Sequence, residues 1–224
     1  MEKPLVHIIE SPGASDFLDD RQEGQVLRRM LELIGINATV YTVVNAHMFA
    51  QAIQRIVALH ATPSGGQFVP MLHISGHGNE QGIGFTDSKD GFLGWDQLAD
   101  AIQPLNAAYR DSLVVTMSTC FGYSAASMAR YDKPIPYGLV VGPTTSVLWS
   151  DATVAFCSFY LQFLRLLKQP KGIGFEAFMQ IIQNMNAAAG LAPATFWLQT
   201  GRTAQSESSK AIVEVLRTLK PVAP

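Results

Sequence analysis

Short apolar runs alternate with longer amphipathic segments along most of this chain. Apolar runs rich in β-branched residues and bounded by turn-forming residues predict strands. Segments with apolar positions three and four residues apart predict the helices between them. The predicted strands span residues 5–9, 39–44, 68–74, 113–117 and 139–141, with a last short strand at 195–198. The predicted helices span residues 22–34, 46–60, 95–108, 151–167, 175–188 and 206–219.

The alternation of strands with helices predicts a mainly parallel sheet that is covered by helices on both faces. We therefore expect an α/β fold, a three-layer α/β/α sandwich with a sheet of about six strands. Segment 151–167 is apolar almost all the way round the predicted helix, which indicates a largely buried element. Neither a repeat nor a linker divides the 224 residues, so we expect residues 1–224 to form a single domain.

Composition narrows the possible partners. The chain has 16 Lys and Arg against 18 Asp and Glu, a net charge of −2, and only 15% charged residues. It therefore lacks the basic face that neutralises phosphates, and we expect no nucleic-acid partner. No apolar stretch has the roughly 18 to 20 residues that cross a bilayer as a helix, so we expect no membrane association. The first apolar run is short and broken by His7, unlike a secretory signal, which predicts a cytoplasmic protein.

Two of the predicted strands end in small residues followed by a reactive side chain. His77 stands between two glycines after the strand at 68–74, and Cys120 follows the strand at 113–117. The carboxyl ends of parallel strands meet at one edge of an open α/β sheet, where ligands bind. The 43-residue separation fits a right-handed crossover through the helix at 95–108. We therefore expect His77 and Cys120 to lie close together.

A thiol beside an imidazole predicts nucleophilic catalysis. His77 would serve as general base and acid for Cys120, and a helix that starts near Gly122 would favour the thiolate. The backbone N–H groups of Gly78 and Cys120 are the candidate donors to an oxyanion. Asn79 is the one visible candidate for a third member, so a dyad is the minimal arrangement.

These motifs resemble the caspase-like cysteine peptidases of clan CD, peptidase family C14. Animal caspases carry Gln-Ala-Cys-Arg-Gly at the nucleophile, with the His about 50 residues upstream. Cys120 and Gly122 match that frame, whereas Ser118 and Phe121 replace its Gln and Arg. The likeness is closer to bacterial caspase relatives of the CHAT type and covers roughly residues 4–188. The matching features follow in the same order: 73–79, Trp95 with Leu98, Cys120, Val141-Gly142 and Phe159-Tyr160.

The resemblance implies a cysteine endopeptidase that cleaves a protein or peptide substrate through an acyl-enzyme intermediate, with neither cofactor nor metal. Ser118 cannot copy the caspase Gln that helps to bind a substrate aspartate, so cleavage after Asp is not implied. Clan relatives that cut after Arg or Lys use an acidic pocket residue, and we favour a basic P1 residue here. The candidate pocket acids are Asp151 and, after the first strand, Asp16, Asp19 and Asp20; each is also a candidate helix cap or loop charge. The substrate-binding residues that we expect are Ser118, Asp151 and Trp149.

Several alternatives remain open. The chain is either a working peptidase, with or without a protein activator, or a catalytically silent caspase-like module that binds or regulates a partner. A Cys120–Cys157 disulfide would silence the thiol, although Cys157 fits a core position better. His73 shares strand parity with His77, but no third metal ligand has a persuasive spacing. Ser124 lies in an incomplete version of the serine-hydrolase elbow, which makes it a weaker candidate nucleophile.

Overall fold

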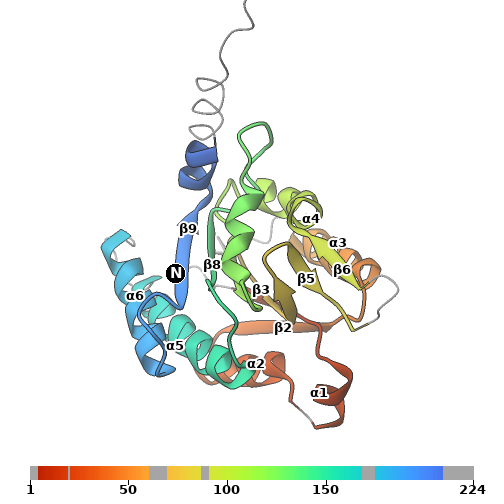
Figure 1. Cartoon of the computed structure of the whole chain (residues 1–224). Coiled ribbons are helices and arrows are strands. Elements are labelled where there is room, and N and C mark those ends of the chain that lie inside the picture. The colour runs from red at the N-terminus through yellow and green to blue at the C-terminus, as the bar shows by residue number, and fades with distance from the viewer. Residues whose placement is uncertain (1–4, 20, 61–69, 87–90, 168–174, 209–224) are drawn as a thin grey trace, which may run out of the picture.

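The computed structural model describes residues 5–19, 21–60, 70–86, 91–167 and 175–208. A six-stranded sheet in the order β2-β1-β3-β7-β8-β9 lies at its centre (Figure 1). The first five of these strands are parallel, and β9 pairs antiparallel with β8. In sequence order the strands are β1 (Leu5–Glu10), β2 (Asn37–Thr42), β3 (Pro70–Ser75), β7 (Val114–Ser118), β8 (Leu139–Pro143) and β9 (Phe196–Thr200).

Helices cover both faces of this sheet and form the three layers expected from the sequence (Figure 1). One face packs against α2 (Glu23–Leu33), α5 (Trp149–Leu167) and α6 (Phe175–Ala188). The other face packs against α3 (Ala46–His60), α4 (Trp95–Ala108) and the 3-10 helix η2 (Gly122–Met128). The predicted α/β sandwich is therefore confirmed.

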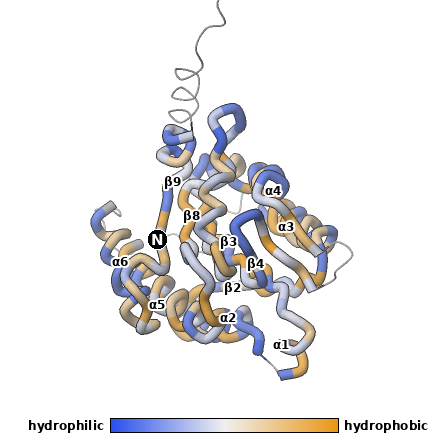
Figure 2. Tube along the Cα trace, in the orientation of Figure 1, coloured by the Kyte–Doolittle hydropathy of each residue, from blue (hydrophilic) through white to orange (hydrophobic). Residues whose placement is uncertain are grey.

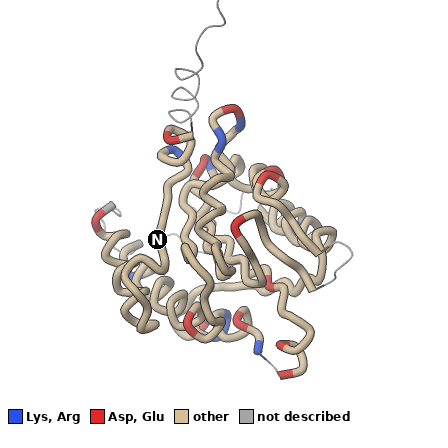
Figure 3. Tube along the Cα trace, in the orientation of Figure 1, with Lys and Arg blue, Asp and Glu red and all other residues tan. Residues whose placement is uncertain are grey.

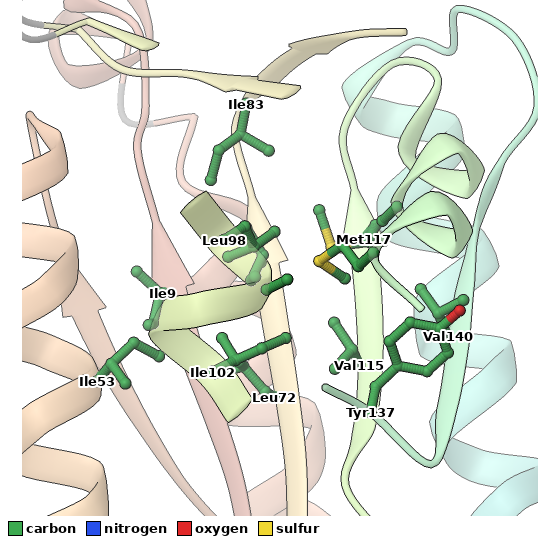
Figure 4. Packing of buried hydrophobic residues seen from close by; sticks show 14 of the residues in the cluster. Ile9, Ile53, Leu72, Ile83, Leu98, Ile102, Val115, Met117, Tyr137 and Val140 are labelled. Atoms are coloured by element: carbon green, nitrogen blue, oxygen red, sulfur yellow. The ribbon is translucent and has the colours of Figure 1, made fainter. Parts of the chain in front are cut away.

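Residues that alternate along each strand contribute to separate cores on the two faces. On β7, Val115 and Met117 join the core under α3 and α4, together with Ile102 of α4 (Figure 4). Val114 faces the opposite core, where Phe156 and Phe159 of α5 are fully buried. The hydropathy along the chain agrees with this arrangement at β8, which is coloured largely hydrophobic (Figure 2). Charged residues stand mainly in the helices and loops around the sheet (Figure 3).

The part of the chain that connects β3 to α4 forms a second, small sheet, which was not predicted. It consists of β4 (His77–Asn79), β5 (Gly82–Gly84) and β6 (Phe92–Gly94), all antiparallel. Ile83 of β5 is 2% exposed and points into the core beside Leu98 (Figure 4), which fixes the hairpin to the main body. The strands have three residues each, too short for a period-two pattern to reveal them.

Other differences concern the ends of elements. The turn-prone segment after β1 contains a short helix, α1 (Ala14–Leu18), and β2 begins and ends two residues before the predicted strand. Residues 68 and 69 of the predicted third strand lie outside the described part of the chain. The last predicted helix is described only to residue 208, and the helical segment begins already at 201. No helix among the described residues combines the length and apolar character needed to cross a membrane.

Candidate functional site

The two strands that precede His77 and Cys120 are direct neighbours in the sheet. β3 and β7 pair in parallel, with Ser75 opposite Ser118 as their last paired residues. The Gly76 N–H donates to the Ser118 carbonyl at 3.2 Å, which continues the contact one residue further. His77 and Cys120 each stand two residues beyond this pair, so both emerge at the same edge of the sheet.

Glycine at position 78 allows the two chain segments to touch. A Cβ atom on Gly78 would lie 2.8 Å from the Cys120 carbonyl oxygen and 2.9 Å from Thr119 Cβ. Contacts this short exclude a side chain. The backbone that follows His77 therefore packs directly against the backbone of Cys120.

The loop between β8 and α5 lies against Cys120, and Trp149, the first residue of α5, lies near His77. The Cys120 thiol is directed at the Val147 carbonyl oxygen, with an Sγ–O distance of 3.7 Å. The Trp149 ring lies 6.3 Å from the His77 ring, measured between centroids. The Phe121 N–H donates to the Thr145 carbonyl at 3.0 Å. The loop and the start of α5 together thus border the segments that carry the imidazole and the thiol.

The residue after Cys120 has an unusual backbone. Phe121 has φ 57° and ψ 23°, in the left-handed region that non-glycine residues rarely occupy. The Gly122 N–H donates to the Thr119 carbonyl at 3.0 Å, so the chain turns sharply around Cys120 before η2 begins. Such conformations persist only where surrounding contacts impose them, and they cluster at functional sites.

The two cysteines differ in environment, and both are free thiols. Cys120 is half-buried at the sheet edge, and His77 beside it is exposed. Burial within α5, helped by the nearby negative charge of Glu23, raises the pKa of the Cys157 thiol to about 11. Cys157 therefore stays protonated at neutral pH and is a poor nucleophile.

The remaining predicted site residues occupy varied positions. Trp149 and Asp151 are half-buried in the first turn of α5, where Asp151 accepts a hydrogen bond from the Ser150 hydroxyl at 3.2 Å. Ser118 is only 5% exposed, and its hydroxyl donates to Glu23 at 2.9 Å. Asn79 does not contact His77 through its side-chain oxygen, which instead accepts the N–H groups of Gln81 and Gly82 in the β4–β5 turn.

The acidic residues after β1 are engaged with an arginine. Asp16 and Asp19 lie 3.2 Å and 2.7 Å from the Arg21 guanidinium, and Asp20 lies outside the described residues. Asp16 also accepts the Gly13 N–H at 3.0 Å. A Cβ on Gly13 would lie 3.3 Å from His77 Nε2, so this loop also borders the imidazole.

The sequence did not reveal a group of buried polar residues in β1, β3 and α2 that lies next to the candidate site. Glu10 and Glu23 are 0% and 3% exposed, and Ser75 is 2% exposed. His73, fully buried, contacts Thr116 and Tyr160 through Nδ1 and does not belong to any cluster of three potential metal ligands among the described residues. A glutamate directly after the apolar run of β1 was a visible signal, whereas Glu23 looks like an ordinary acid in the first turn of a helix.

Comparison with solved structures finds a protein of similar fold. The chain is similar to a secreted C11 cysteine protease from Bacteroides thetaiotaomicron, called iotapain, with a TM-score of 0.57 and 9% sequence identity. The superposition covers 97% of this chain and 72% of the protease chain. No family model and no curated protein matches the sequence. Likeness at this identity defines the fold, so the chain has the caspase-like α/β fold.

Proposed function

We propose that the chain is a cysteine endopeptidase in which His77 and Cys120 form the catalytic dyad. The observation that carries the proposal is the pairing of Ser75 with Ser118, since it brings the histidine and the thiol to adjacent strand ends. The caspase-like fold and its likeness to a cysteine protease support the same reaction class. The resemblance to family C14 and to CHAT-type relatives belongs to this proposal, as does a single peptidase domain over residues 1–224.

The chemistry begins with proton transfer from the Cys120 thiol to His77. Because the thiol is directed at the Val147 carbonyl, it must give up this contact when its proton passes to the imidazole. The thiolate then attacks the substrate carbonyl carbon, and the N–H groups of Gly78 and Cys120 donate to the oxyanion. His77 returns the proton to the leaving amine, which breaks the peptide bond. Water activated by His77 hydrolyses the thioester and restores the thiol.

The loop between β8 and α5 supports a substrate site on one side of the dyad. Trp149 is near His77, and Asp151 follows it in the first turn of α5. We propose that Trp149 contacts the substrate and that Asp151 favours a basic P1 side chain. Ser118, also predicted to bind the substrate, is given no direct contact with it in this proposal. Its part in the site is the hydrogen bond that it donates to Glu23. Asp16 and Asp19 are weaker candidates because Arg21 already pairs with both.

Selective alkylation tests the dyad without knowledge of the substrate. Iodoacetamide should label Cys120 of the native protein much faster than Cys157, and His77→Ala should remove this advantage. Cys120→Ala is the control that assigns the label and abolishes cleavage of a peptide library. Equal labelling of the two thiols, together with absence of cleavage in any context, would favour the silent binding module instead.

The library also tests specificity and the need for an activator. A basic P1 preference that disappears in Asp151→Ala supports the pocket, and an aspartate preference contradicts it. Activity that appears only after a partner protein is added would assign the activator. A cytoplasmic location is also part of the proposal, and recovery of the chain outside producing cells would contradict it.

A further inference from the structure

Two successive residue pairs of β3 and β7 are polar and buried on the face covered by α2 and α5. His73 pairs with Thr116, and Ser75 pairs with Ser118. His73 Nδ1 lies 2.8 Å from Thr116 Oγ1, and each of these atoms also lies within 3.1 Å of the Tyr160 hydroxyl. We call these four strand residues the polar seam. His77 follows Ser75 by two residues, and Cys120 follows Ser118 by two residues. The dyad therefore continues the same alternate positions beyond the end of the seam.

Glu23 bridges the Ser75–Ser118 pair of the polar seam, which is the pair nearer to His77 and Cys120. Its Oε2 accepts a hydrogen bond from the Ser75 hydroxyl at 2.6 Å, and its Oε1 accepts one from the Ser118 hydroxyl at 2.9 Å. A single carboxylate, held at the first position of α2, thus spans the gap between the two strands. Because each serine lies two residues before a dyad member, the bridge is at the last regular position before the site.

The surroundings show that this bridge depends on hydrogen bonds. Among the described residues, neither Lys nor Arg lies within ion-pair distance of Glu23, and the one basic group there is His73 Nε2 at 3.8 Å. The other carboxyl group that acts on it is that of Glu10, which offers repulsion and no compensation. A carboxylate in a buried position is costly unless hydrogen bonds satisfy it. Two hydroxyl donors from two different strands meet that need only while the strand ends keep their spacing. Separation of the strand ends therefore breaks at least one buried hydrogen bond.

From these contacts we propose that Glu23 is a positioning residue, which clasps the ends of β3 and β7 and thereby sets the separation of His77 from Cys120. The inference rests on the proposed function for its catalytic meaning. Glu23 touches neither dyad member in the contacts above and acts through Ser75 and Ser118. Small displacements of reacting groups cost on the order of 10²-fold in rate, so the spacing of this pair matters for catalysis.

The test compares Glu23→Leu, which removes both acceptors, with Glu23→Gln. The glutamine keeps one acceptor oxygen, and its amide donates to the other serine hydroxyl, which also accepts. Asn106→Ala is the matched control. Asn106 is a fully buried amide that accepts the Leu113 N–H at 3.1 Å, at the start of β7 and therefore at the opposite edge of the sheet. The readouts are amide hydrogen exchange, the ratio of Cys120 to Cys157 alkylation, and kcat and KM on a cleaved peptide.

Glu23→Leu should accelerate exchange at residues 76–78 and 119–122 by about tenfold or more beyond the change caused by lower global stability. It should lower the Cys120 labelling advantage and reduce kcat by about 10²-fold with a smaller change in KM. Glu23→Gln should stay close to the wild type in exchange, labelling and kcat. Asn106→Ala should lower the global stability and show no further change in these readouts. Equal effects of Glu23→Leu and Asn106→Ala on exchange at the two segments would overturn the clasp. This exchange comparison needs no activity, so it decides the clasp even if wild-type Cys120 proves unreactive and the proposed function fails.

Discussion

Glu10 provides a sharp test of the electrostatics below the site. Its side chain is fully buried at the end of β1, where Oε1 accepts the Gly24 N–H at 2.9 Å. Oε2 has no hydrogen-bond partner among the described residues. Burial, together with the negative charge of Glu23, outweighs that hydrogen bond and raises the pKa of Glu10 from 4.5 to about 7. The carboxyl group is therefore protonated in the folded protein at mildly acidic pH.

The sign of the effect follows from proton binding in the two states. Between pH 4.5 and about 7 the folded protein holds a proton on Glu10 that the unfolded chain has lost. The stabilisation is thus fully present below pH 4.5, declines as the pH rises, and is lost above pH 7. At 1.36 kcal/mol for each unit of pKa difference, the contribution of Glu10 changes by about 3 kcal/mol across this window.

Glu10→Gln removes this titration with little change in shape. The amide keeps an acceptor for Gly24 and is neutral at every pH, so the variant and the wild type should have similar stability at pH 4.5. At pH 8 the variant should be more stable by about 3 kcal/mol. Urea unfolding of both proteins at several pH values measures the difference. A difference in unfolding free energy that stays constant from pH 4.5 to 8 would refute a raised Glu10 pKa.

Three further predictions concern other positions. Burial and the neighbouring His60 lower the pKa of His7 to about 4, so the contribution of His7 to stability should fall by about 3 kcal/mol as the pH drops from 6.5 to 4, measured against His7→Gln. Gly78→Ala should slow Cys120 alkylation at least about tenfold, because its Cβ would press on the Cys120 carbonyl; an unchanged rate would contradict the close packing. Cys157 should react about a hundredfold more slowly than an ordinary cysteine at pH 8, as quantitative mass spectrometry of labelled peptides can determine, since its thiolate fraction is lowered by that factor.

Much of the fold could be predicted because the apolar residues of helices and strands recur at regular intervals along the sequence. The helices at 46–60 and 175–188 have the predicted bounds, and β8 begins at the predicted residue. Their apolar positions recur at helical spacing or form a short run between turn residues, and the structure buries several of those that it describes, such as Phe49, Ile182 and Val140. The small sheet and α1 were missed because elements of three to five residues leave no periodic signal. Their conformation depends on contacts with the rest of the chain, such as Ile83 against the core.

The candidate site shows the same division. Two strand ends and their order in the chain were enough to predict that His77 and Cys120 emerge at one edge, because parallel strands align their carboxyl ends. The hydrogen bond between Ser118 and Glu23 could not be predicted from strand order, since the two residues lie 95 positions apart in the sequence. Asn79 was likewise a reasonable candidate by proximity, yet its side chain completes the β4–β5 turn. Polar side chains gain their roles from partners that only the folded chain brings near.

The two perturbed groups on β1 have opposite effects on the pH dependence of stability. His7, near the beginning of the strand, is held neutral by a lowered pKa, and Glu10, at its end, is held neutral by a raised one. As the pH rises from 4.5 to 6.5, His7 adds stability while Glu10 removes a similar amount, so their sum changes by less than about 1 kcal/mol. A flat stability profile of the wild type would therefore not show that both groups are ordinary. Glu10→Gln should uncover a rising profile over this range and His7→Gln a falling one, and two flat variant profiles would show that burial perturbs neither group.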